Sequence, residues 1–118
     1  DHENNLALIK INKSNLSTVG FADAEKIKLG QAVFFVAPIS VENNETGQNG
    51  QNNWLANTGV ISQIDQNSIK TNIVEKNKIV FGSPLFNSAG QLVGINFISS
   101  EGKISAVPID KIKDLLGL

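Results

Sequence analysis

Side chains that could carry out covalent or acid–base chemistry are few in this chain of 118 residues. Cysteine is absent, and His2 is the only histidine. A serine hydrolase needs a hydroxyl nucleophile beside an imidazole base, with N–H donors that stabilise the oxyanion. His2 belongs to a polar terminal stretch, where side chains are usually solvated. We interpret His2 as a surface residue and keep an Asp1–His2 dyad as the alternative.

Neither a metal nor a cofactor is expected. The carboxylates do not follow the spacing of a calcium loop or of a paired-carboxylate motif, and no thiolate ligand is present. We therefore predict a solvated surface for five acids: Asp23, Glu25, Asp65, Asp110 and Asp114.

Composition restricts the class of protein. Hydrophobic residues make up 41% of the chain, charged residues 18%, and the net charge is -1, which is typical of a globular domain. Without a basic field we expect no nucleic-acid partner, and without a long apolar run we expect no membrane insertion. The chain opens on DHENN without an initiator Met, so we expect a piece of something longer. Its lack of cysteine leaves the compartment open.

Short apolar runs between turn formers predict strands over residues 6–11 and 32–37, the second ended by Pro38. Residues 58–65 and 68–75 flank a two-residue turn and predict a hairpin. The connector to residue 28 suits a single helical turn.

The second half predicts another hairpin, over residues 84–86 and 91–98 around Gly90, followed by a strand over 103–107. After Pro108 the apolar residues fall on one helical face, and Gly117 suits the helix end. Six or seven short strands and one helix favour a small all-β barrel or sandwich.

Residues 42–53 contain no hydrophobic side chain. Such a segment cannot offset the entropy lost on ordering, so we expect a mobile loop with a solvated tip. It is either a variable contact or an insertion without a role. Trp54 follows it, and we interpret this side chain as a lid on the core, with a partner anchor as the alternative.

Five segments, in order, resemble the second lobe of trypsin-like serine proteases of the bacterial HtrA (high-temperature-requirement) type. They are NLALIKI, LGQAVFFVAPI, NTGVISQI with IKTNIVEK, IVFGSPLFNSAGQLVGIN, and ISAVP ahead of IDKIKDLLGL. The resemblance implies a six-stranded antiparallel Greek-key barrel with a C-terminal helix. It also divides the chain into residues 1–28, the last strand of the first lobe plus a connector, and residues 29–118, the C-terminal barrel.

The resemblance breaks at the positions that carry catalysis. The family's orienting Asp falls on Asn5, its nucleophilic Ser on Phe81, and the oxyanion glycine of G-N-S-G-G-P-L on Ile79. A phenyl ring cannot attack a carbonyl, so we expect Phe81 to fill the emptied site as core packing. With a two-residue deletion, Ser83 would become an alternative nucleophile, but it would still lack a base.

We therefore predict a pseudoprotease: a non-catalytic domain that binds a protein or an extended peptide. The expected groove residues come from two segments: Ile79, Val80, Phe81, Gly82 and Ser83, and Ile104, Ser105, Ala106 and Val107. The alternatives are an active serine endopeptidase that uses Ser83 with a histidine from an upstream lobe, and a structural barrel used for oligomerisation.

The resemblance also implies partners and a compartment. Residues 6–11 belong in the family to the first barrel, so their backbone edge lacks its neighbours here. We expect this segment to dock on the lobe's own surface or to pair with another chain, as an oligomer or with a missing N-terminal lobe. The family resemblance favours a periplasmic or otherwise extracytoplasmic location.

Overall fold

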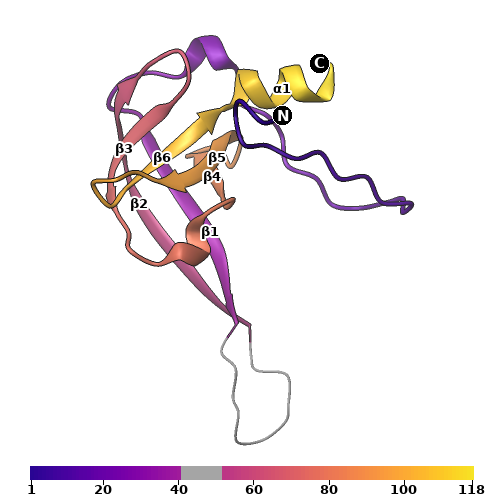
Figure 1. Cartoon of the computed structure of the whole chain (residues 1–118), viewed down its shortest axis with the longest axis horizontal. Coiled ribbons are helices and arrows are strands. Elements are labelled where there is room, and N and C mark those ends of the chain that lie inside the picture. Colours follow the sequence, from indigo (N-terminus) through magenta and orange to yellow (C-terminus); the bar gives the residue numbers. More distant parts are fainter. Residues whose placement is uncertain (41–51) are drawn as a thin grey trace, which may run out of the picture.

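The structure, a computed structural model, describes residues 1–40 and 52–118 (Figure 1). In this part of the chain six antiparallel strands close into a barrel in the order β1-β2-β3-β6-β5-β4. Because β3 lies beside β6 and β4 to β6 follow one another, the connectivity is a Greek key, which confirms the predicted fold class. The strands are β1 Ala32–Ser40, β2 Asn52–Ile64, β3 Ile69–Val74, β4 Pro84–Asn87, β5 Leu92–Ile98 and β6 Lys103–Pro108.

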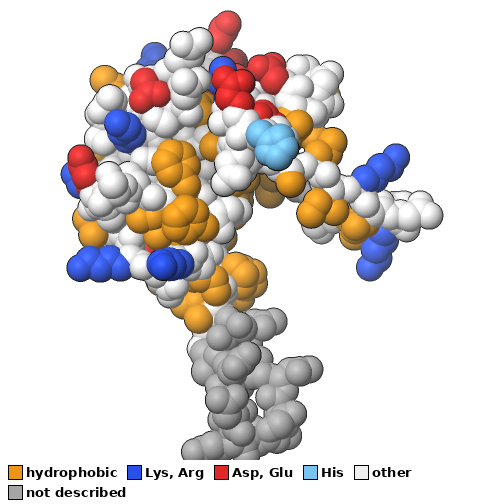
Figure 2. Space-filling view, in the orientation of Figure 1, with side chains coloured by type: hydrophobic (Ala, Val, Ile, Leu, Met, Phe, Trp, Pro, Cys, Tyr) orange, Lys and Arg blue, Asp and Glu red, His pale blue; other side chains and the backbone are white. Residues whose placement is uncertain are grey.

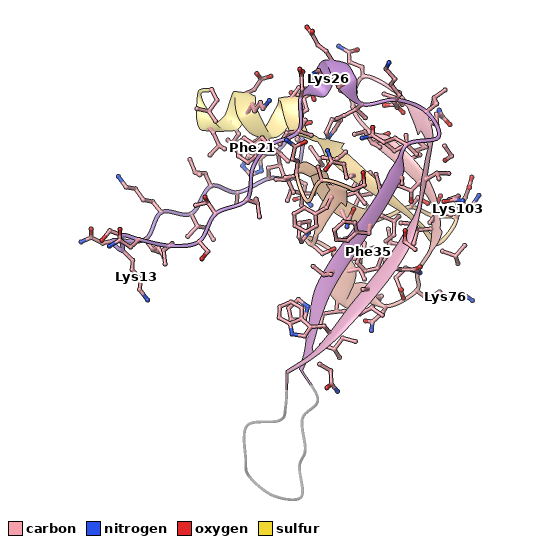
Figure 3. The ribbon with its side chains drawn as sticks, turned by 180° about the vertical axis from the view of Figure 1, so that it is seen from behind. Lys13, Phe21, Lys26, Phe35, Lys76 and Lys103 are labelled. Carbon is pink, nitrogen blue, oxygen red and sulfur yellow. The ribbon has the colours of Figure 1, made fainter. Side chains whose placement is uncertain are left out.

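Alternating apolar residues build the barrel interior. Along β3 buried and exposed residues alternate strictly, and in β1 Val33, Phe35 and Ala37 are buried. Phe35 points into the barrel in Figure 3. The two predicted hairpins are confirmed, as β2–β3 and β4–β5.

The helix α1, Ile109–Leu116, covers one end of the barrel. Ile109 and Ile112 are buried against Leu92 of β5, and Gly117 ends the helix with a left-handed φ of 73°. The predicted helix and its C-terminal signal are therefore confirmed. No helix in the described part of the chain is long and apolar enough to cross a bilayer.

Two predicted strand boundaries are wrong. β1 does not end at Pro38 but continues to Ser40, because Pro38 lies beyond the stretch where β4 pairs with β1, Val33 to Phe35. Its missing N–H faces an edge with no strand beside it, where proline is tolerated. β2 begins at Asn52, earlier than predicted; residues 42–51 of the expected loop lie outside the described residues.

The predicted strand over residues 6–11 is also wrong. These residues begin an extended arm that leaves the barrel, returns at Phe21 and carries Lys13 near its tip (Figures 1 and 3). Only Leu6 packs on the lobe, whereas Ile9 is 81% exposed, so the expected docking on the lobe's own surface is not found. None of the described strands lies beside the arm to bond its backbone, and pairing with another chain stays a prediction.

The connector forms the expected single helical turn, η1 (Ala24–Lys26), capped by the Asp23 side chain. Phe21 forms a bridge with Leu92, and the Lys113 ammonium donates to the Ala22 carbonyl at 3.2 Å. Residues 21–27 thus pack at the same end of the barrel as α1.

Candidate functional site: a cavity beside the degenerate nucleophile turn

A cavity of about 610 Å³ lies between the N-terminal turn and one side of the barrel. Its walls combine apolar side chains with amide groups, and Glu3 is its only charged side chain among the described residues. The lining residues are Glu3, Asn4, Asn5, Leu6, Asn67, Phe81, Gly82, Ile95, Asn96, Phe97 and Val107. This composition suits an apolar side chain attached to a polar backbone.

The turn between β3 and β4 positions Phe81. Residues Lys78–Val80 form one 3-10 turn, η2, which the Asn77 side chain caps. Val80 points into the core and is fully buried, whereas Phe81 is 54% exposed at the cavity. The expectation that Phe81 fills the emptied site as core packing is therefore wrong, because the neighbouring valine takes the interior position.

The backbone donors of this turn are already bonded. The Ile79 N–H donates to Asn77 Oδ1 at 3.1 Å, and the Phe81 N–H donates to the Lys78 carbonyl at 3.1 Å. An oxyanion hole needs two such N–H groups, from the nucleophile position and two residues before it, directed at empty space. Since both donors are consumed within the turn, it offers no preformed oxyanion hole in this conformation.

Ser83 is buried and engaged on both sides. Its hydroxyl donates to the Val80 carbonyl at 2.6 Å and accepts a hydrogen bond from Asn96 Nδ2 at 3.0 Å. The single hydroxyl proton is therefore committed to a carbonyl, which cannot act as a general base.

Asn96 is the buried polar group at the cavity wall. It is 2% exposed, and its backbone accepts from the Gly82 N–H and donates to the Ser83 carbonyl, each at 2.8 Å. Because its Nδ2 must donate to Ser83, its orientation is fixed and Oδ1 is left as an acceptor. Within the described part of the chain Oδ1 has no partner, which is costly unless a donor reaches it.

His2 and Asp1 do not form a dyad. The one ion pair among the described residues joins Lys103 and Glu101 at 4.0 Å. His2 is exposed, as expected, and the single histidine side chain is visible on the surface in Figure 2. Asn5, at the position of the orienting Asp, lines the cavity with a left-handed φ of 52°.

The predicted groove residues separate into two groups. Phe81, Gly82 and Val107 line the cavity. Ile104, Ser105 and Ala106 are buried in β6, which pairs with β3 on one side and β5 on the other. β6 therefore has no free edge along these three residues.

The free backbone edge next to the cavity belongs to β5, which the sequence did not indicate. Pairing with β4 ends at Ile95, and the backbone of Asn96 is occupied by Gly82 and Ser83. By strand alternation the Ile98 N–H and C=O point to the same side, where no described strand follows. The one available signal is the polar Asn96 inside the apolar run LVGINFI.

The acids behave as solvated surface groups, as predicted. No group of three or more His, Cys, Asp or Glu side chains in the described ranges could hold a metal ion. Asp65 closes the β2–β3 turn by accepting from the N–H groups of Asn67 and Ser68 and from the Ser68 hydroxyl. These bonds, that of Asn67 first, lower the pKa of Asp65 below its usual value.

Comparison with known proteins agrees with this geometry. The profile of the trypsin-like peptidase domain matches residues 1–95, most of the chain. The chain belongs to the trypsin-like peptidase family. In this trypsin-like domain the closed six-stranded barrel with its C-terminal helix is consistent with a lobe of the family's fold, and its assignment to the second lobe stays a prediction.

Curated relatives lie in the HtrA-type branch. The trypsin-like domain is 31% identical to the serine endoprotease DegS of Haemophilus influenzae, over 98% of this chain and 36% of the relative. It is 32% identical to a probable periplasmic serine endoprotease DegP-like protein of Pseudomonas putida, over 93% of this chain and 24% of the relative. A probable periplasmic serine endoprotease DegP-like protein of Halomonas elongata is 29% identical, over 98% of this chain and 25% of the relative. The chain thus spans a quarter to a third of these relatives.

Proposed function

We propose that this trypsin-like domain is a non-catalytic module that binds an extended peptide or protein segment. The observation that carries the proposal is the state of the turn at Phe81. A ring replaces the nucleophile, the hydroxyl of Ser83 is bonded to a carbonyl, and the N–H groups of Ile79 and Phe81 are used internally. Acyl transfer instead requires a nucleophilic side chain, a hydroxyl proton directed at a base, and N–H groups that are free to stabilise the oxyanion.

Peptide binding does not require those groups. An extended segment can add along the free edge of β5 at Ile98, using backbone hydrogen bonds for affinity. One of its side chains would then enter the cavity between Phe81 and Val107, whose walls are largely apolar.

A peptide titration followed by NMR tests the proposal. With extended peptides that carry one apolar side chain, we expect amide shifts to gather at Gly82, Phe97 and Ile98. Phe81→Ala should weaken binding about tenfold, because truncating an anchor at an interface costs more than 1 kcal/mol. Leu29→Ala is the control, since Leu29 is 66% exposed and does not line the cavity. Equal effects of the two variants would contradict the proposal.

A second candidate is suggested by the names of the relatives, which are serine endoproteases. In that case Ser83 is the nucleophile, and an upstream lobe supplies the histidine. A fluorophosphonate probe separates the two functions: the non-catalytic domain stays unlabelled, both as this chain and within its longer protein. Labelling that disappears in Ser83→Ala would establish the hydrolase.

The location follows the same relatives. Two of them are named as probable periplasmic proteins, so we propose an extracytoplasmic location for the protein that contains this domain. Fractionation of cells that express this protein tests the location: it should be recovered outside the cytoplasmic fraction.

A further inference from the structure

Among the described residues, the outer edge of β2 is unpaired over most of the strand. β1 pairs with β2 from Asn52 to Val60, but β3 pairs with the other side of β2 only from Ile61 to Ile64. Residues 36–39 of β1 and 53–56 of β2 therefore form a two-stranded ribbon that projects from the barrel (Figure 1).

The hydrogen bonds at Ile61 show which backbone groups face outward. Its N–H donates to the Gln31 carbonyl and its own carbonyl accepts from the Gly30 N–H, so odd-numbered residues of β2 face the β1 side. Since the direction alternates along a strand, even-numbered residues face away from β1. The outward N–H groups of Thr58 and Val60 donate to the side chains of Asn57 and Asn72.

Among the described residues, Trp54 and Ala56 have no such partner. Their N–H and C=O groups face outward, and β1 is the only described strand that pairs with this part of β2. Unpaired strand edges are templates for further pairing, and proteins usually protect them with charges, proline or a bulge. Pro38 protects the opposite edge of the ribbon, whereas β2 has neither a charged residue nor a proline.

The ribbon also carries an exposed apolar face. Trp54 is 66% exposed, and Ala56 lies two residues further on the same face. Pro38 stands directly across from Trp54 in the register and is exposed as well. In Figure 2 hydrophobic side chains gather where the barrel meets the grey residues. The expectation that Trp54 is a lid on the core is therefore wrong, because the strand turns this residue to solvent.

We infer that this edge of β2 is a pairing surface for a second copy of this chain. Antiparallel pairing about a two-fold axis at Ala56 places Ala56 opposite its counterpart, and Trp54 opposite Thr58 of the second copy. In this register the outward groups of Trp54 and Ala56 meet outward groups of the second copy, and the Thr58 N–H exchanges its bond to Asn57 Oδ1 for one to the Trp54 carbonyl of the other copy. The same patch then serves both molecules, as two-fold symmetry demands.

Three features favour a second copy over an unrelated strand. The strand is uncharged over its full length, so self-pairing brings no like charges together. Ala56, on the axis, is small enough for close approach. The ribbon projects from the barrel, so two barrels joined through their ribbons lie apart (Figure 1).

Trp54 makes the inference measurable, because the chain contains one Trp and no Tyr. In a concentration series followed by sedimentation, we expect a dimer, with Trp54 emission shifting to the blue as the dimer forms. As the dimer forms, hydrogen exchange should slow at the backbone amides of Trp54 and Ala56. Packing of the exposed apolar side chains alone, without pairing of the backbone, would not slow it. Ala56→Lys places two like charges on the axis and should weaken the dimer at least tenfold or so.

Ala32→Lys is the matched control. Ala32 is also an exposed strand alanine, on β1 and opposite Val60, but it is away from the free edge. This variant should dimerise as the parent chain does. A chain that stays monomeric, or a dimer that survives Ala56→Lys or leaves the amides of Trp54 and Ala56 exchanging freely, would overturn the inference. Slowed exchange at these amides only after addition of another protein would overturn it too, by assigning the edge to a different partner.

Discussion

Ser83 and Asn96 share a hydrogen bond of 3.0 Å at the wall of the cavity, and that bond sets the role of both side chains. Ser83 must accept from the amide because its own proton goes to the Val80 carbonyl. Asn96 must donate, which leaves its Oδ1 as a buried acceptor without a partner among the described residues. The serine is therefore a structural link between β4 and β5.

Ser83→Ala is expected to lower the free energy of unfolding by about 1–3 kcal/mol, because it leaves the buried Nδ2 of Asn96 without an acceptor. Urea denaturation measures the change. Ser88→Ala is the control: Ser88 lies exposed in the β4–β5 turn, where replacements usually change stability by less than about 0.5 kcal/mol. Equal stability of the two variants would show that the buried bond contributes nothing.

Phe81→Ser should not create a hydrolase. The new hydroxyl would have no imidazole beside it, because His2 does not line the cavity at residue 81, and the backbone N–H groups of residues 79 and 81 would remain bonded within the turn. Fluorophosphonate labelling should stay at background. The stability cost should be below about 1 kcal/mol, because Phe81 is already 54% exposed. The buried neighbour is the contrast: Val80→Ala should cost roughly 1–3 kcal/mol.

Gly94 allows β5 and β6 to approach closely beside the cavity. A Cβ at this position would collide with the Val107 carbonyl and lie 3.0 Å from the Ala106 Cβ. Gly94→Ala should therefore destabilise the barrel by about 2–3 kcal/mol, as measured by thermal and urea unfolding. Gly20→Ala is the matched variant, because no atom lies within 4 Å of its added Cβ. If Gly94→Ala left the free energy of unfolding unchanged, β5 and β6 would be able to move apart at no cost in stability.

Asp65 predicts a pH dependence of stability. Its pKa is lowered by the N–H of Asn67, the Ser68 hydroxyl and the Ser68 N–H, so the folded state favours the carboxylate. A depressed pKa stabilises the fold above the unfolded value of about 3.9, and this contribution is lost as pH falls through the folded value. Between about pH 5 and pH 2 the free energy of unfolding of the Asp65→Asn variant should therefore fall less than that of the parent chain. Parallel acid denaturation curves for the two proteins would exclude this role.

Local sequence signals were sufficient for most of the barrel. Alternation in β3, the turn at Gly90 and the apolar face of α1 depend on near neighbours in the chain, which a pattern reveals directly. The same holds for the chemistry of residue 81, since a phenyl ring cannot attack a carbonyl. The motif order also predicted the family.

The site depended on distant contacts. The sequence could not show that Val80 rather than Phe81 enters the core, or that β6 is paired on both sides while β5 keeps a free edge at Ile98. Neither could it show that residues 6–11 find no neighbouring strand, although their pattern is that of a strand.

The sequence by itself thus determined most of the elements and the kinds of side chain available for chemistry, because backbone preference and side-chain type are local properties. Only the tertiary structure decided which backbone groups are left free, because pairing depends on where strands end relative to one another. That is why Trp54 is turned outward at an open edge, and why Oδ1 of Asn96 is buried without a hydrogen-bond partner among the described residues.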